Sequence, residues 1–190
     1  MNTSPPSHST ELLHRQRSRL LLVDLQGRLL PVILEREALI ARCRLLALGA
    51  QILSVPIHLT EQYPQGLGTT IPEIAEFAAD RPAKLRFSAV ECLGWGPPGP
   101  DEPFQIVVAG IEAHVCILQT VLDLLALGYQ VHVAVDAVSD RIALDQQIAL
   151  RRMELSGAVL TTAETVLFEW CETAGTPEFK AISKLVTGQG

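Results

Sequence analysis

The sequence predicts an open, three-layer α/β sandwich in which helices cover both faces of a six-stranded parallel sheet. Short runs of Val, Ile and Leu alternate along the chain with segments whose apolar residues recur at helical spacing. The runs are continuously apolar, which is typical of parallel strands that are buried on both faces. Hydrophobic residues make up 48% of the 190 residues and charged residues 19%, as expected for one domain with a sizeable core.

The first half of the chain supplies three of the expected strands. The first strand, 19–24, is followed by a helix that we expect to end at Gly49, because glycine commonly ends helices. A second strand is expected over 50–60 and a weaker third strand over 83–87. The segment 61–73 between them is rich in Pro and Gly, so we expect it to be a loop.

The second half of the chain contains three more strands, each followed by a helix. The expected strands are 104–110, 129–138 and 158–162. The expected helices are 114–128, 145–157, 163–175 and 176–186. This alternation favours parallel strands, because a crossover through a helix returns the chain in the same direction.

The polar N-terminus differs from the rest of the chain. We expect residues 1–17 to form a flexible arm and residues 18–190 to form one domain. The arm lacks the apolar centre of a secretory signal, and no apolar run is long enough to span a bilayer. A net charge of −6 without a basic stripe argues against nucleic-acid and anionic-membrane surfaces. We therefore expect a cytoplasmic protein that binds neither nucleic acid nor membrane.

The four cysteines fall into two groups. No two of them have a C-x-x-C spacing, which disfavours a zinc ribbon or a dithiol redox motif, and a cytoplasmic chain is not expected to form disulfides. Cys43, Cys92 and Cys171 are interpreted as structural thiols, since free cysteine is among the most buried residue types. Cys116 differs because it lies in the first turn of a helix that directly follows a strand.

Chemically active side chains follow several expected strands, at the edge where open α/β sheets bind ligands. Asp24 follows the first strand, Lys84 lies beside the third, Cys116 follows the fourth and Asp136 follows the fifth. A thiol at a helix N-terminus has its thiolate stabilised, so we expect a lowered pKa for Cys116. The backbone N–H groups of such a turn can also hold an oxyanion.

Each of these residues also has a plainer interpretation. Cys116 can pack a helix against the sheet, Asp24 can cap a turn, and Lys84 can be a solvated surface residue. We expect Asp136 to support the neighbouring turn and helix start. Together, however, Asp24, Lys84 and Cys116 supply a base, a cation and a nucleophile at one sheet edge, which is the pattern of a covalent hydrolase site.

The chain resembles the isochorismatase-like cysteine hydrolases, and most closely their isochorismatase domain-containing subgroup. The residues that carry the resemblance include "LLLVDLQGRL", "KLRFS" and "VAGIEAHVCILQTVLDLLALGYQVHVAVDAVSDR", in family order over 18–187. The resemblance implies a Rossmann-like, isochorismatase-like hydrolase fold. It implies that Asp24 is the general base, Lys84 the cation and Cys116 the nucleophile of a catalytic triad. It also implies a cis peptide bond before Glu112, whose N–H would form an oxyanion hole with the N–H of Cys116.

The implied reaction is hydrolysis of an amide-type or related small-molecule carbonyl substrate through a thioester. Gln26, Gln62, Tyr63 and His114 fall near the implied pocket, where they either bind substrate or brace loops. Nicotinamidase relatives hold a metal through an Asp-x-His pair after the second strand, but Pro56 takes the place of that aspartate before His58. We therefore expect no metal and no cofactor, and a packed His58. Family members are commonly homo-oligomers, so we expect a dimer or a higher oligomer.

Three other functions are open on the sequence. Dinucleotide binding is disfavoured, because no G-x-G-x-x-G directly follows a strand. A thiol redox or peroxide-responsive protein would also use a reactive cysteine, but it would not need Asp24 and Lys84 in concert with Cys116. A non-catalytic oligomeric scaffold on the same fold would need none of these three residues.

Overall fold

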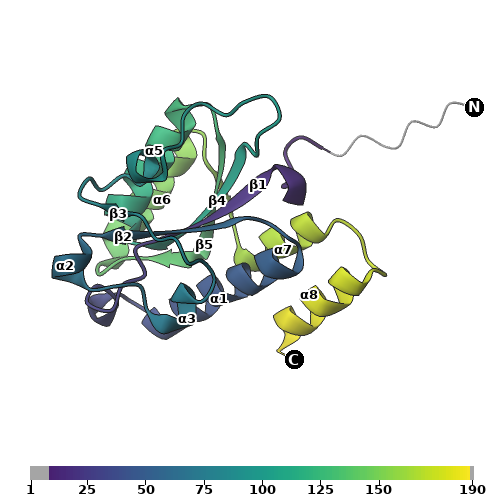
Figure 1. Cartoon of the computed structure of the whole chain (residues 1–190), viewed down its shortest axis with the longest axis horizontal. Helices are drawn as coiled ribbons and strands as arrows, with labels where there is room; N and C mark the ends of the chain where they lie inside the picture. The colour runs from purple at the N-terminus through teal and green to yellow at the C-terminus, as the bar shows by residue number, and fades with distance from the viewer. Residues whose placement is uncertain (1–8, 189–190) are drawn as a thin grey trace, which may run out of the picture.

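A computed structural model describes residues 9–188 of the protein. Its six strands form one parallel sheet in the order β3-β2-β1-β4-β5-β6, which confirms the predicted fold class (Figure 1). The strands are β1 (Ser18–Val23), β2 (Ile57–Gln62), β3 (Ala83–Lys84), β4 (Gln105–Ile111), β5 (Gln130–Ser139) and β6 (Val159–Thr161).

Helices cover both faces of the sheet (Figure 1). One face carries α1 (Arg36–Ile52), α3 (Pro72–Ala75), α7 (Ala163–Cys171) and α8 (Pro177–Thr187). The other carries α4 (Val90–Leu93), α5 (Leu118–Ala126) and α6 (Ala143–Leu155). Shorter elements are η1 (Arg15–Arg17), η2 (Leu30–Val32), α2 (Pro64–Leu67) and the π-helical η3 (Ala113–Ile117). Within residues 9–188, none of the helices is long and apolar enough to cross a membrane.

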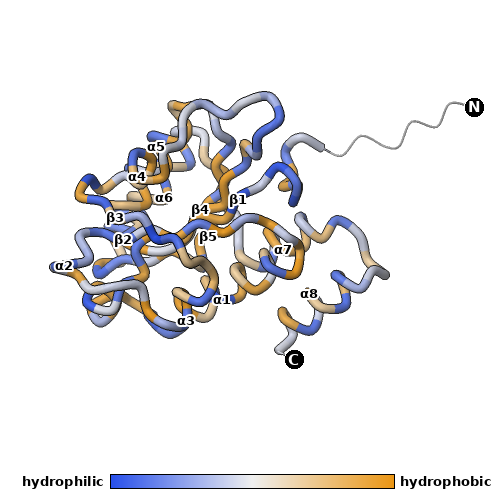
Figure 2. Tube along the Cα trace, in the orientation of Figure 1, coloured by the Kyte–Doolittle hydropathy of each residue, from blue (hydrophilic) through white to orange (hydrophobic). Residues whose placement is uncertain are grey.

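The continuous apolar runs form strands because both faces of the sheet are buried. Successive side chains of a strand point to opposite faces. Leu20 and Leu22 of β1 accordingly lie in the core beneath α1 and α7, whereas Leu21 and Val23 lie in the core beneath α5 and α6. Figure 2 shows the resulting hydrophobic centre along β1, β4 and β5. β1 therefore stabilises two separate cores at once.

Gly49 does not end α1, contrary to our expectation. The helix continues to Ile52, and β2 begins only at Ile57, so the first residues of the expected second strand are helical. A Cβ atom at Gly49 would lie 2.1 Å from Cδ2 of Leu167 in α7. The glycine is therefore explained by the close approach of two helices and not by a helix end, a distinction that depends on tertiary packing.

The segment before β1 is partly packed against the domain. Leu13 is fully buried, and its N–H donates to Oε2 of Glu169 at 2.8 Å. The N–H of His14 donates to Oε1 of Gln105, also at 2.8 Å. The packed domain thus begins before residue 18, where we expected it to start. Residues 1–8 of the predicted arm, and residues 189–190, lie outside the described residues.

The strand order places the carboxyl ends of β1 and β4 side by side. The chain runs outward from β1 through β2 to β3, and then crosses to the opposite side of β1 to form β4. Such a reversal of strand order is the usual ligand-binding point of open α/β sheets. Val23 pairs with Gly110 there, and a Cβ atom at Gly110 would lie 2.2 Å from the backbone oxygen of Val23. Only glycine permits this close approach.

Candidate active site

A buried ion pair lies at the carboxyl ends of β1 and β3. Nζ of Lys84 is 2.7 Å from Oδ2 of Asp24, and both side chains are almost completely buried. Nζ also donates to Oε1 of Gln62 at 2.5 Å and to the backbone oxygen of Phe87 at 2.7 Å. Oδ1 of Asp24 accepts a hydrogen bond from Oγ1 of Thr60 at 2.8 Å. Each charge thus has several partners, as buried charges require.

The backbone changes direction at Asp24, immediately after β1 ends. The φ of Asp24, 56°, lies in the left-handed region, which aspartate enters more readily than β-branched residues do. The N–H of Asp24 still donates to the backbone oxygen of Thr60, so the backbone stays tied to β2 while its direction changes. The pairing of β2 with β3 places Gln62 opposite Lys84 and so brings the cation to the same edge.

Cys116 lies beside this ion pair in the π-helical turn η3. We expected an α-helix to begin at 114, but α5 begins only at Leu118. The thiol is buried, and Sγ lies 4.0 Å from Oε1 of Gln62, in interaction range of Asp24 and Lys84. Oγ1 of Thr120 donates to the backbone oxygen of Cys116 at 2.6 Å and fastens this turn to α5.

The environment of Cys116 favours the neutral thiol. Burial and, after it, the negative charge of Asp24 raise the pKa of Cys116 to about 12, against the lowering effect of Lys84. The lowered pKa that we expected from the sequence is therefore wrong for the unliganded protein, because desolvation outweighs the attraction of nearby positive charge. At neutral pH the sulfur carries its proton, and reaction requires a base to remove it.

The turn before Cys116 contains a cis peptide bond between Ile111 and Glu112, which agrees with the bond that the resemblance implies. The backbone oxygen of Glu112 accepts hydrogen bonds from the N–H groups of Val115 and Ile117, both at 3.1 Å. The chain therefore closes a tight turn around this bond. Glu112 and Cys116, the two residues expected to form an oxyanion hole, lie at the two ends of the turn.

Asp140 and Arg141 hold the same turn from the end of β5. Oδ1 of Asp140 lies 2.8 Å from Nδ1 of His114 and accepts the backbone N–H of His114 at 3.3 Å. Nε of Arg141 donates to Oε2 of Glu112 at 2.8 Å. Asp140 is fully buried, and burial raises its pKa although His114 lowers it. These two residues fix positions 112 and 114 of the turn.

Sequence reasoning missed this pair because it considered only Asp136 at this edge and counted it after the fifth strand, although the expected strand 129–138 contains it. Asp136 lies within β5, which extends to Ser139. Its Oδ1 accepts the N–H of Ala163 at 2.8 Å, at the start of α7, so its expected support of a helix start is confirmed. The signal that could have identified Asp140 and Arg141 is the polar end of "VSDR", after the apolar run.

The other predicted pocket residues differ in how their side chains are used. The amide of Gln26 binds both backbone groups of Gln62 and also the oxygen of Gly68, which favours bracing over substrate contact. Gln62 touches Lys84 and Cys116 and so belongs to the polar cluster. Tyr63 is half-exposed at the start of α2, and His114 is partly exposed.

A group of possible metal ligands occurs beside η3. Candidate ligand atoms of Glu112, His114 and Asp140 lie within 4.8 Å of one another. Glu112 is already bound by the Arg141 cation and His114 by Asp140, so these contacts account for the cluster without an ion. His58 lies elsewhere, in β2, where its ring meets the edge of Trp95 at 5.0 Å and burial lowers its pKa, as expected for a packed histidine.

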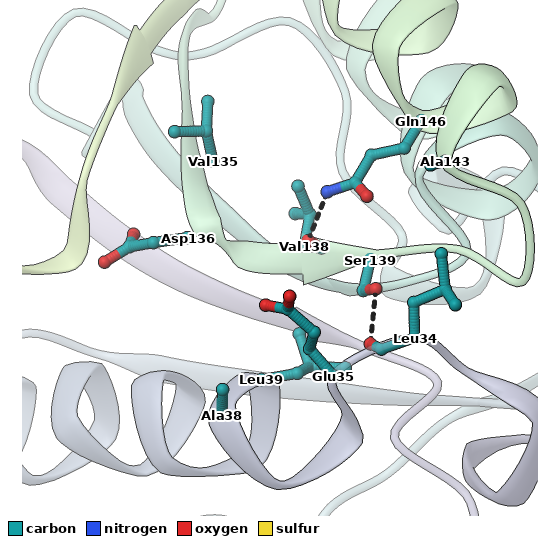
Figure 3. Close-up of a pocket in the computed structure, with 10 residues that line it drawn as sticks. All are labelled: Leu34, Glu35, Ala38, Leu39, Val135, Asp136, Val138, Ser139, Ala143 and Gln146. Carbon is teal, nitrogen blue, oxygen red and sulfur yellow. Dashed lines mark hydrogen bonds between the residues drawn. The ribbon is translucent and has the colours of Figure 1, made fainter.

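Two cavities lie near strands on either side of β1 in the sheet, one at β3 and one at β5. One, of about 410 Å³, has Lys84, Ser88 and Cys92 in its wall and opens beside β3. The other, of about 280 Å³, lies between α1, β5 and α6 (Figure 3). In its wall, Oγ of Ser139 donates to the oxygen of Leu34 at 2.8 Å and fastens the end of β5 to the segment before α1. Of the ion pair, Lys84 contributes to the wall of the first cavity.

These features define a class of protein: an open, Rossmann-like α/β fold with a buried Asp–Lys pair and a cysteine at its strand-order reversal. The Isochorismatase domain family model matches residues 99–165. The isochorismatase domain-containing protein 2A of Mus musculus is 40% identical over 171 residues, which cover 90% of this chain and 83% of that protein. The chain therefore belongs to the isochorismatase family.

Solved structures agree with this assignment. A structure described as MAR1 ribonuclease from Caenorhabditis elegans has a TM-score of 0.84 and 38% identity, and the match covers 93% of this chain and 92% of that one. The YcaC gene product of Escherichia coli, described as an octameric hydrolase of unknown specificity, has a TM-score of 0.80, 23% identity and coverages of 96% and 94%. YcaC from Pseudomonas aeruginosa, described with covalent acrylamide, has a TM-score of 0.80, 22% identity and coverages of 97% and 100%. Both YcaC matches support the fold alone.

Proposed function

We propose that the protein is a cysteine-dependent hydrolase that acts on a small amide-type or related carbonyl substrate. The observation that carries this proposal is the buried contact of Lys84 with Asp24 beside the thiol of Cys116. A nucleophile, a base and a cation in one desolvated cluster are the groups that acyl transfer needs. The cavity of about 410 Å³ beside Lys84 suits a small molecule.

In the first step, Sγ of Cys116 attacks the carbonyl carbon while its proton moves to Asp24. The new bond is S–C, and the carbonyl electron pair moves to oxygen, where the N–H groups of Glu112 and Cys116 stabilise it. This proton transfer leaves the total charge of the cluster unchanged. Negative charge moves from Asp24 through sulfur to the carbonyl oxygen without a free thiolate, so a thiol with a raised pKa can still react.

In the second step, the tetrahedral intermediate collapses. The bond from carbon to the leaving nitrogen breaks, and Asp24 returns its proton to that nitrogen, which leaves a thioester on Cys116. Water then attacks the thioester carbon and gives a proton to Asp24. The C–S bond breaks, the acid product leaves, and the thiol regains its proton from Asp24.

Further parts of the proposal concern partners and location. We propose a homo-oligomer of two or more subunits, since a structure of the same fold is described as octameric. The four cysteines are free, which is in keeping with a reducing compartment such as the cytoplasm. The acidic chain, with its net charge of −6, is proposed to bind neither nucleic acid nor anionic membranes, and the triad needs no cofactor.

A second candidate function is the hydrolysis of RNA. It is favoured by one observation, namely that the C. elegans structure with 38% identity is described as a ribonuclease. The acidic net charge disfavours it, because affinity for a phosphate backbone comes mainly from neutralising Lys and Arg residues. The two candidates differ in the substrate that is cut and so can be tested together.

The test is a panel of small amides, esters and a short RNA, assayed with wild type, Cys116→Ala and Cys92→Ser. Cys92 is the matched control, because it is a thiol in the wall of the adjoining cavity. Amide or ester hydrolysis that disappears in Cys116→Ala and persists in Cys92→Ser, with an acyl adduct on Cys116 by mass spectrometry, supports the proposal. Hydrolysis that persists in Cys116→Ala overturns the mechanism. Cleavage of RNA alone supports the second candidate, and peroxide-driven oxidation of Cys116 without hydrolysis supports a redox role.

A further inference from the structure

Helix α6 has a fixed orientation on the sheet. Ala149 and Met153 are buried in the core that α6 shares with α5. Nε2 of Gln146 points the same way and donates to the backbone oxygen of Val138 at 3.0 Å (Figure 3). These three residues occupy one side of the helix at 100° per residue, so the residues on the opposite side face outward.

The outward side of α6 carries three exposed apolar residues, on one line with the exposed Arg151. Leu144, Ile148 and Leu155 are 63%, 53% and 77% exposed, and their spacing of four and seven residues places them on one line along the helix. We call these three residues the α6 stripe. Ile142, which directly precedes the helix, is also 55% exposed. A helix of a monomer normally presents charged and polar residues on this side, so the stripe indicates a partner surface.

The charges beside the stripe indicate which partner fits. Asp145 lies near the start of α6 and Arg152 near its end, and the helical spacing places both on the same flank of the stripe. When two copies of α6 lie antiparallel around a two-fold axis near Ile148, the same flank of each copy meets. Asp145 of each copy then faces Arg152 of the other, and the two helix dipoles also oppose each other. The flank that carries Asp145 and Arg152 is therefore complementary to itself.

We propose that the α6 stripe is the contact surface for a second copy of this chain, with the two α6 helices antiparallel around a two-fold axis near Ile148. A two-fold contact uses the same patch on both subunits, as this stripe requires. Leucine and isoleucine side chains from the two helices then interdigitate and leave water. The inference rests on the proposed homo-oligomer but not on the proposed chemistry. It places the partner next to Arg141, which precedes Ile142 and holds Glu112.

The first test measures molar mass in solution by size-exclusion chromatography with light scattering. The double variant Leu144→Asp/Ile148→Asp is compared with wild type and with Val32→Asp. Val32 is the matched control, because it is also an exposed apolar residue but lies in η2, away from the stripe. We expect an even-numbered oligomer for wild type and Val32→Asp, and half that mass for the double variant, with unchanged circular dichroism. A monomeric wild type overturns both this inference and the homo-oligomer, and an unchanged mass in a folded double variant overturns the inference alone.

The second test uses charge reversal and does not depend on adding charge to an apolar surface. Asp145→Arg and Arg152→Asp are each expected to weaken the oligomer, because each places like charges opposite each other. The combined variant Asp145→Arg/Arg152→Asp is expected to restore it. Recovery supports the antiparallel arrangement. If each single variant weakens assembly and the combined variant does not recover it, Asp145 does not face Arg152 of the other copy. That outcome overturns the antiparallel arrangement.

Discussion

The central strands of the sheet have an apolar body and a charged carboxyl end. In the body, Leu21, Val108 and Val133 are buried and belong to one hydrophobic core. At the carboxyl end, Asp24 and Asp140 are equally buried, yet each is bound to a cationic or ring-nitrogen partner. Strand ends lie beside loops that can supply polar partners, whereas the middle of a sheet has no such loops beside it. Equally buried positions therefore hold apolar side chains in the middle of these strands and paired charges at their ends.

The two charged contacts at the carboxyl end also differ from each other. The pair of Lys84 and Asp24 is almost fully desolvated, whereas Arg141 is half-exposed in its contact with Glu112. Exposed ion pairs contribute little to stability, while breaking a desolvated pair leaves an uncompensated charge. The comparison therefore predicts that the Asp24 side of the reversal point is energetically more sensitive than the Asp140 side.

The largest expected effect is that of Lys84→Met. It leaves the carboxylate of Asp24 buried without its cation, which we expect to lower the free energy of unfolding by about 3–5 kcal/mol. Urea denaturation followed by fluorescence measures this loss. Lys180→Met, at an exposed position of α8, is the control and should change stability by less than about 0.5 kcal/mol. Adding Asp24→Asn to Lys84→Met should recover most of the loss, and a double variant no more stable than Lys84→Met would contradict the explanation.

A smaller effect is expected for Asp140→Ala. The change removes the acceptor for the backbone N–H and the ring of His114, which should cost about 1–3 kcal/mol. Hydrogen exchange at the amide of His114 should accelerate in the variant, which distinguishes loss of this contact from general destabilisation. Asp123→Ala, on the exposed side of α5, is the control. If His114 exchanges no faster than the rest of η3, Asp140 does not hold the turn.

The thiol of Cys116 distinguishes the two charges of the ion pair. Asp24 raises and Lys84 lowers the pKa of Cys116, so Asp24→Asn should increase its rate of labelling by iodoacetamide at mildly alkaline pH. Lys84→Met should decrease that rate. Each unit of pKa changes the thiolate fraction about tenfold. Labelling is measured by peptide mass spectrometry, with Cys171, which lies in the core on the opposite face of the sheet, as the internal reference. Asp24→Asn should nevertheless abolish hydrolysis, because it removes the proposed base. Equal labelling of Cys116 in wild type, Asp24→Asn and Lys84→Met would contradict the opposite effects of the two charges.

The smallest effect concerns a polar group in the body of the sheet. Burial lowers the pKa of His132 from 6.5 to about 4, so the unfolded chain binds the proton more tightly. This contribution to stability is present above pH 6.5 and is lost as the pH falls towards about 4. Between neutral pH and a pH of about 6, the change should stay below about 1 kcal/mol. His132→Leu should flatten this part of the stability profile measured by urea denaturation, and an unaltered slope would show that His132 is not desolvated.

The sequence predicted the order of elements better than their ends. Continuous apolar runs identified five of the strands, because a two-sided core leaves a strong compositional signal, whereas the expectation for 83–87 was weaker and β3 is only Ala83–Lys84. The end of α1 was misplaced because glycine has two uses, and only the neighbouring Leu167 distinguishes close packing from a helix end. The place of Asp140 was missed, because Asp136 interrupts the apolar run while its carboxylate accepts the N–H of Ala163 at the start of α7. These errors all depend on contacts between distant residues.

By itself, the sequence determined the fold class, the family pattern and the residue types at the reversal of strand order. Apolar periodicity and the resemblance around Cys116 suffice for that, since both are local properties of the chain. Only the tertiary structure decided the protonation state of the thiol, the partners of Asp24 and the bonds that hold the turn from 112 to 116. The physical reason is desolvation: a pKa depends on how much water and charge surround a group, and β1, β3 and β4 supply those surroundings together.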